Sequence, residues 1–414
     1  MKLQSYGCYT IQSALGAPGE AGYIHIPNAS LDMNTTITVW GFDTRGVDFT
    51  NHFEFVLIPV PEAENTFYLV NRRSGLALQV VDPKTPGGPQ IIVQAKPGEG
   101  KPDDPSDDEV AERAAQFVFE RTEDRGVFMI ANQSTGTYLS IKDTKTANGT
   151  PLIALPAIQA AQGTDEAPRR FRMDLVTSLM GKVPTLSTKT GPRFPRLANL
   201  DIDLPGSTPA QLREVDVIPF FAINDAVYPR HRQVEASPYY TLSLSTMWRK
   251  VNDRQVDGIV ERETVETTET GLTTIDAQSV ASTFGWSVAL EAQAGVKKFG
   301  FSASLKVASK LAGETRKTAE STAQHNEAHT FTETILYPAI GEPYRLVTWR
   351  PVDRYELRRK DGSLVESWDA LRPEEEAIDV FPTKTSVPGR KLSPTQPARA
   401  ARAAERKALS GVGS

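Results

Sequence analysis

The chain has 414 residues, and its 46 Lys and Arg against 51 Asp and Glu give a formal net charge of −5. That balance excludes a general nucleic-acid binder, whose signature is a strongly basic face. No run of about 18 or more apolar residues occurs, which excludes a transmembrane helix. The single cysteine, Cys8, excludes an intrachain disulfide. The length predicts two or three domains.

The first 176 residues contain a sequence that occurs three times. Asn71–Ala95 aligns without gaps to Asn132–Pro156, with eight identical residues in 25 positions and an offset of 61. A third copy begins at Tyr23. Each copy closes in a strand around an aromatic residue, at Phe53, Phe117 and Phe171. Because turns of Asn, Gly, Pro and Asp separate short apolar runs, residues 1–176 are predicted to form a threefold β-structure.

One motif gives this threefold unit a resemblance to a lectin fold. Thr146–Pro151 reads T-x-N-G-T-P, and the closing strands carry a degenerate Q-x-W-like pattern. Residues 1–176 are similar to the ricin-type β-trefoil lectins, in which an aromatic platform and polar groups bind a sugar. By that resemblance, His25 and Trp40 of the first unit are the candidate carbohydrate-binding residues. The simpler interpretation of Trp40 as a core or rim aromatic residue is favoured.

Composition divides the rest of the chain into three parts. Residues 177–214 contain five prolines, which disfavour a long helix or a central strand and predict a linker. Residues 215–382 hold long stretches rich in Thr, Val, Tyr and charged residues, such as Glu261–Thr270, which favour strands with a polar face. Residues 383–414 are basic and predict a disordered tail or one that trypsin-like proteases remove.

Residues 284–311 alternate between apolar and small or polar residues. The parity reverses at Lys297–Lys298, so a hairpin that turns there places the apolar residues on one face. That face comprises Phe284, Trp286, Val288, Leu290, Val296, Phe299, Phe301, Leu305 and Val307. Three interpretations stay open: one side of a soluble β-sandwich, a helical second strand, or a membrane-inserting hairpin, for which strands of about 9–11 residues suffice. Insertion would need several protomers, because one hairpin leaves unpaired strand edges in lipid.

Two stretches give the second half a resemblance to a toxin family. They are DVIPFFAIND at Asp216–Asp225 and SPYYTLSLSTMW at Ser237–Trp248, and the Thr- and Glu-rich strands and the amphipathic hairpin follow them. With the trefoil ahead of them, the chain resembles the binary-toxin-like insecticidal crystal proteins of bacteria. The resemblance implies a mostly β protein, with an N-terminal β-trefoil (1–176) followed by an elongated aerolysin-like antiparallel β-sheet domain (215–382).

The same resemblance implies a function and partners. The trefoil would recognise a receptor or glycan. The second domain would form a homo-oligomer and insert the hairpin into the target-cell membrane, alone or with a second toxin component. Production in the bacterial cytoplasm, free or in inclusions, is implied as well, since no apolar signal segment follows Met1. The alternatives are a non-lytic lectin-like protein with an elongated β-stalk and a trefoil attached to an enzyme.

Catalytic and metal-binding patterns are sparse in the sequence. It contains no P-loop, G-x-G-x-x-G, G-x-S-x-G or H-E-x-x-H motif. His325 and His329 share a face in a helix or a strand, but a zinc site needs at least a third ligand. We therefore expect no enzyme activity, no cofactor and no metal.

Overall fold

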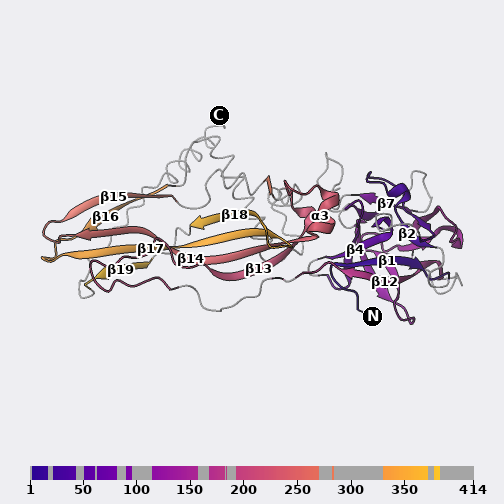
Figure 1. Cartoon of the computed structure of the whole chain (residues 1–414), viewed down its shortest axis with the longest axis horizontal. Coiled ribbons are helices and arrows are strands. Elements are labelled where there is room, and N and C mark those ends of the chain that lie inside the picture. Colours follow the sequence, from indigo (N-terminus) through magenta and orange to yellow (C-terminus); the bar gives the residue numbers. More distant parts are fainter. Residues whose placement is uncertain are drawn as a thin grey trace, which may run out of the picture.

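The computed structural model describes residues 2–16, 22–42, 51–60, 63–81, 90–95, 114–156, 167–181, 183, 193–269, 282–283, 330–371 and 377–382. Figure 1 shows an elongated molecule, in which the N-terminal strands form a head and a long, narrow β-sheet extends away from it. The predicted inserting residues from Phe284 to Val307, the pair His325 and His329, and the tail 383–414 lie outside the described residues.

Six strands of the head form a closed antiparallel barrel. They are β1 (Gly7–Ser13), β4 (Glu54–Pro59), β5 (Thr66–Asn71), β8 (Gln116–Arg121), β9 (Val127–Asn132) and β12 (Arg170–Ser178). Each strand pairs with the next in this order, and β12 pairs with β1. Alternate residues point inward, so that Ile11, Leu57 and Phe117 are fully buried in the barrel core.

Three hairpins complete the head. They are β2 (Tyr23–His25) with β3 (Thr38–Trp40), β6 (Ala77–Val81) with β7 (Gln90–Ala95), and β10 (Tyr138–Ile141) with β11 (Thr150–Leu155). Strand β11 pairs with both β3 and β7, so the hairpins meet. Short 3₁₀ turns connect the strands: η1 (Pro27–Ala29), η2 (Asn51–Phe53), η3 (Lys142–Thr144) and η5 (Ala167–Arg169). This arrangement is a β-trefoil, as predicted for the N-terminal part of the chain.

The sequence repeat has a local physical cause in the turns that follow β5 and β9. The side-chain oxygen of Asn71 accepts hydrogen bonds from the backbone N–H of Arg73 and Ser74, at 3.1 and 3.2 Å, and Asn132 does the same for Ser134 and Thr135 at 3.1 Å each. An Asn side chain bonded in this way fixes a turn without help from distant residues. The two copies therefore keep Asn at the same position.

The second half of the described chain is a long antiparallel sheet. Its strands are β13 (Gln211–Pro219), β14 (Tyr239–Val256), β17 (Tyr344–Arg359), β18 (Leu364–Leu371) and β19 (Ala377–Phe381). The order is β13-β14-β17-β18, and β19 pairs with the other half of β17. Between β13 and β14 lie η6 (Phe220–Ala222) and α3 (Arg230–Ala236), next to the head (Figure 1). The elongated antiparallel sheet confirms the second half of the predicted fold class.

Residues 193–208 pack along this sheet without regular structure. Leu197 and Leu204 lie in one apolar cluster with Trp349 of β17. The guanidinium of Arg345 donates hydrogen bonds to the backbone carbonyls of Leu200 and Ile202, at 2.9 and 2.6 Å. Part of the Pro-rich stretch therefore covers the sheet as well as connecting it to the head.

Two further strands form a small separate sheet. β15 (Arg262–Glu269) pairs antiparallel with β16 (Thr330–Tyr337). The Asn252 amide of β14 donates a hydrogen bond to the Tyr337 hydroxyl at 2.9 Å, and Arg254 donates one to the Thr264 hydroxyl at 2.6 Å. These contacts tie the pair to the long sheet, above which it lies in Figure 1.

The head and the sheet share one apolar core. Its members from the head include Tyr6, Cys8 and Val56, and its members from the sheet domain include Phe220 and Tyr240. A large apolar contact of this kind opposes relative domain motion. No helix within the described part of the chain is long and apolar enough to cross a membrane.

Candidate functional site

The predicted pair His25 and Trp40 lies on the β2–β3 hairpin. His25 pairs with Thr38, and Tyr23 pairs with Trp40. Because alternate residues of a strand share a face, all four side chains lie on the same side of the hairpin. The intervening Ile24 is fully buried on the opposite side, in the barrel core.

The two predicted side chains are in contact. The His25 ring centroid lies 5.4 Å from that of Trp40 and 5.2 Å from that of Phe53, which stacks on it at 25°. The Thr38 hydroxyl lies 3.0 Å from Nδ1 of His25. His25 is only 5% exposed, whereas Trp40 is 41% exposed. Trp40 is therefore the part of this cluster that a ligand can reach.

Burial decides the charge of His25. It lowers the pKa of the imidazole from its ordinary value of 6.5 to about 4, and the nearby His52 acts in the same direction. The contact with the Thr38 carbonyl opposes this shift only in part. His25 is therefore neutral near pH 7, and the Thr38 hydroxyl can donate a hydrogen bond to Nδ1.

The lectin-like motif of the third unit lies beside Trp40 of the first. The Asn148 side-chain oxygen accepts a hydrogen bond from the Gly41 N–H at 2.8 Å. A Cβ atom at Gly149 would lie 3.7 Å from the Trp40 ring. The flat indole is thus held at the junction of two units, and its exposed face is suited to stacking on a sugar ring. No observation tests sugar binding, so this assignment stays a prediction.

In the other two units, the position equivalent to Trp40 does not hold an aromatic residue. Gln94 of the second unit is fully buried, and its amide donates hydrogen bonds to the backbone carbonyls of Ser30 and Asp32, at 3.1 and 2.6 Å. In the third unit the position is Leu155. Among the positions compared, the first unit is therefore the best candidate.

We expect the folded chain to lose stability relative to a His25→Gln variant as the pH falls from about 6.5 to about 4. Because the pKa of His25 is about 4 in the folded chain, the unfolded chain binds a proton in this range that the folded chain does not. The expected difference reaches about 3 kcal/mol. Guanidinium unfolding of both proteins at about pH 7 and about pH 4 measures it. A difference in unfolding free energy that does not change with pH would contradict this expectation.

A buried ion pair between Asp225, which precedes α3 in the chain, and Arg359 of β17 borders a cavity of about 690 Å³. Nε and Nη2 of Arg359 lie 2.7 and 2.8 Å from the two carboxylate oxygens of Asp225, and the Tyr240 hydroxyl donates to the same carboxylate at 2.8 Å. Burial raises the pKa of Asp225, but the hydrogen bonds from Arg359, the Val227 N–H and Tyr240 outweigh it, so the pKa lies below its usual range. No motif in the sequence predicts this pair.

Beside this pair, Asn224 contacts a dipeptide that is far away in the sequence. Its backbone N–H donates to the Thr283 carbonyl at 2.7 Å, and its side-chain amide donates to the Ser282 carbonyl at 3.1 Å. All three residues border the cavity. The signal in the sequence was the position of Ser282 and Thr283, which directly precede the predicted hairpin.

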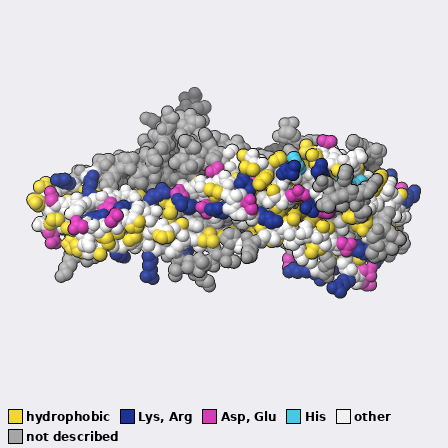
Figure 2. Space-filling view, in the orientation of Figure 1, with side chains coloured by type: hydrophobic (Ala, Val, Ile, Leu, Met, Phe, Trp, Pro, Cys, Tyr) yellow, Lys and Arg dark blue, Asp and Glu magenta, His cyan; other side chains and the backbone are white. Residues whose placement is uncertain are grey.

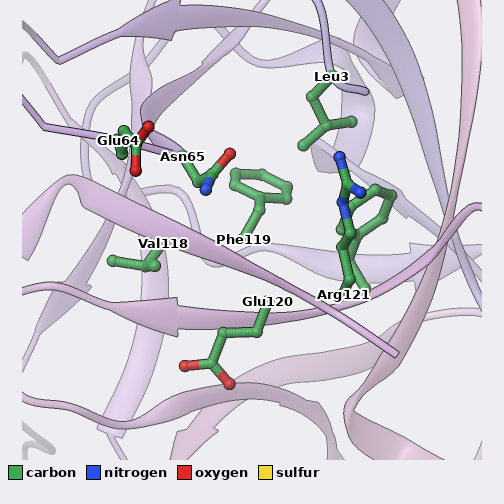
Figure 3. Close-up of a pocket in the computed structure, with 8 residues that line it drawn as sticks. Leu3, Glu64, Asn65, Val118, Phe119, Glu120 and Arg121 are labelled. Atoms are coloured by element: carbon green, nitrogen blue, oxygen red, sulfur yellow. The ribbon is translucent and has the colours of Figure 1, made fainter. Parts of the chain in front are cut away.

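A second cavity, of about 350 Å³, lies between β8 and the turn before β5. Figure 3 shows Phe119 between Asn65 on one side and Leu3 and Arg121 on the other, while Glu120 points away from the ring. The Glu120 carboxylate accepts a hydrogen bond from the Tyr138 hydroxyl, at 3.1 and 3.0 Å from its two oxygens. The polar groups do not converge here, so this cavity has no acid–base pair.

The charges on the surface are mixed. Figure 2 shows Lys and Arg side chains interspersed with Asp and Glu along the visible face of the sheet. The described residues contain no group of three or more His, Cys, Asp or Glu that could hold a metal ion. The functional candidates in this part of the chain are therefore the Trp40 cluster and the region around Asn224 and Asp225.

Comparison with known proteins finds a family that the second half of the chain resembles. Residues 214–383 match the family model described as insecticidal crystal toxin, P42. This part of the chain is similar to that toxin family. The match confirms the resemblance inferred from Asp216–Asp225 and Ser237–Trp248 in what we now name the P42 domain.

Solved structures extend the likeness over the head. The crystal structure of Cry35Ab1 is similar over 92% of this chain and 91% of its own, with a TM-score of 0.60 and 12% identity, which shows a shared fold for trefoil and P42 domain together. The designed protein ThreeFoil matches 41% of this chain over 99% of its own, with a TM-score of 0.30 and 18% identity. The Rhizoctonia solani agglutinin matches 42% over 98%, with a TM-score of 0.30 and 16% identity. A search of curated proteins found no match.

Proposed function

We propose that this chain is a β-pore-forming toxin of bacterial origin that acts on insects. Its trefoil binds a receptor or glycan, and its P42 domain oligomerises and inserts the 284–311 hairpin into the target-cell membrane. The match of the P42 domain to the insecticidal crystal toxin family model supports the toxic activity. The lack of a recognised catalytic motif in the sequence favours action on the membrane over an enzymatic mechanism.

The register of β15 and β16 carries this proposal. Facing residues in this ladder have numbers that sum to 599, as for Arg262 and Tyr337. If the same register continued, even-numbered residues before the turn would face odd-numbered residues after it. Within residues 284–296 and 303–307 those positions are the apolar sets. A ladder in this register would thus place the apolar residues of that stretch on one face, as a lipid-facing strand pair requires.

The finer assignments belong to the same proposal. We divide the chain into a trefoil (1–176), a linker (177–214), the pore-forming part (215–382) and a basic tail (383–414). The partners are the target membrane, a receptor or glycan, further copies of the chain and, as an open alternative, a second toxin component. Synthesis takes place in the bacterial cytoplasm, free or as inclusions, and release precedes action.

Dye release from liposomes and from insect-gut vesicles, before and after trypsin, tests the pore. We expect release together with a detergent-stable oligomer. The absence of both dye release and a detergent-stable oligomer under all of these conditions would refute the proposal. Glycan binding without release would instead support the second candidate, a non-lytic lectin-like protein, which the exposure of Trp40 favours.

We expect Trp40→Ala to weaken glycan binding by about tenfold or more, because it removes the exposed indole on which a sugar ring can stack. Leu155→Ala is the matched control, since it changes the corresponding position of the third unit and leaves Trp40 in place. Binding of both variants on a glycan array measures the effect. Equal binding by Trp40→Ala and the unchanged chain would rule out His25 and Trp40 as carbohydrate-binding residues.

A further inference from the structure

Asn224 makes an unusual contact for a surface residue. Its backbone and side chain both donate to consecutive carbonyls, of Thr283 and Ser282, at 2.7 and 3.1 Å. Thr283 is 8% exposed at this point, although it is 59 residues away in the sequence. Two directed hydrogen bonds and the burial of Thr283 fix the dipeptide against the P42 domain.

Asn224 is itself held firmly from both sides. The carbonyl of Ile223, which precedes it, accepts a hydrogen bond from the Gln233 amide at 3.0 Å, and Ile223 is part of the core shared with the head. Asp225, which follows it, forms the bidentate pair with Arg359. The donor groups are therefore positioned before they meet the dipeptide, and little entropy is lost on contact.

The position of the dipeptide in the chain gives the contact its meaning. Residue 283 directly precedes Phe284, the first residue of the proposed inserting hairpin. The hairpin cannot move away from the P42 domain along its whole length while Ser282 and Thr283 remain bonded to Asn224. We propose that Asn224 is a fastener that holds the inserting segment at its N-terminal end and sets the barrier for its release. This inference rests on the proposed pore function.

We expect loss of the Asn224 contact to raise the rate of dye release, whereas a general disturbance of the fold would lower it. Asn224→Ala removes the side-chain hydrogen bond to Ser282 and keeps the backbone bond to Thr283. One side-chain hydrogen bond of this kind corresponds to about a two- to tenfold change in rate. We expect the initial rate of dye release from liposomes to rise by that factor. Most substitutions that merely disturb a fold would lower it.

Asn199→Ala is the matched control. It also removes one side-chain hydrogen bond to a backbone group, the Asp201 N–H at 3.0 Å, in the irregular segment 193–208. We expect its release rate to equal that of the unchanged chain. Equal rates for Asn224→Ala and Asn199→Ala would overturn the fastener. If the unchanged chain releases no dye before or after trypsin, the proposed function itself fails.

A covalent version of the contact gives a second, independent test. The two backbones are hydrogen-bonded at this point, so the double variant Asn224→Cys with Thr283→Cys is the pair that we choose for a disulfide cross-link. We expect the oxidised double variant to lose dye release at least tenfold and the reduced form to regain it. The single variant Asn224→Cys should not respond to reductant. Full release by the oxidised, cross-linked protein would overturn the proposal.

Discussion

Asp225→Ala should lower the free energy of unfolding by about 3–5 kcal/mol. The side chain of Asp225 is fully buried, and that of Arg359 is 10% exposed. The substitution leaves the guanidinium of Arg359 buried with its bidentate partner removed, and it also removes the acceptor for the Tyr240 hydroxyl. The cost arises from a charge that has lost its partner, and not from the net value of the pair.

Guanidinium unfolding of Asp225→Ala and of a surface control measures this effect. Glu356→Ala removes the partner of Arg358 in a pair whose side chains are 31% and 38% exposed. Water replaces the lost contact there, so the expected cost is at most about 1 kcal/mol. If the two variants are destabilised equally, Asp225 and Arg359 are not a buried pair in solution.

The same pair makes stability depend on pH in a definite direction. The pKa of Asp225 lies below its usual range in the folded chain, so the ionised carboxylate stabilises the fold above the ordinary pKa of 3.8. This contribution is lost as the pH falls from 3.8 through the lower folded pKa. His25 acts in the adjacent, higher range between about 6.5 and about 4, where its burial also makes the folded chain less stable as the pH falls.

The trefoil could be predicted from the sequence because its determinants are local and repeated. The Asn71 and Asn132 turns are made by hydrogen bonds to residues two and three positions away. The resemblance to lectins also selected His25 and Trp40, which the structure places on one face of the β2–β3 hairpin. It could not show that His25 is buried, because that depends on the stacking of Phe53 from another part of the head.

The ends of the long strands of the P42 domain could not be predicted. The composition of residues 215–382 favours strands with a polar face, but it does not show that β14 continues to Val256 and β17 to Arg359. The extensions contain charged residues, which do not favour a strand unless each has a partner of opposite charge on a neighbouring strand. Arg249, for example, lies 2.6 Å from Asp369 of β18, which is 120 residues away.

Contacts between distant segments account for what the sequence did not predict. The shared core of head and sheet joins Cys8 to Tyr240, and the Asp225–Arg359 pair joins segments 134 residues apart. No periodicity or motif encodes such pairs, since each residue alone is ordinary for its position. The fold class could therefore be predicted, but not the mechanical link between trefoil and sheet.

Leu290→Arg should abolish dye release, with a loss of at least about a hundredfold. If residues 284–311 form a membrane hairpin, position 290 faces lipid, where an Arg costs about 2–4 kcal/mol near the bilayer centre. The cost recurs in every protomer of the assembly, so a ring of several subunits would be far more sensitive than a single chain. The reason is the desolvation of the charge, and the soluble form need not be destabilised.

Gln293→Arg is the control that makes this result decisive. Position 293 has the opposite parity, so in the same hairpin its side chain faces the water-filled lumen, where a charge is tolerated. Liposome release by the two variants, with unfolding curves of both soluble forms, separates an inserted hairpin from one side of a soluble β-sandwich. A soluble β-sandwich predicts that Leu290→Arg unfolds more easily than Gln293→Arg. A parity effect on release at equal stability fits an inserted β-strand at these positions.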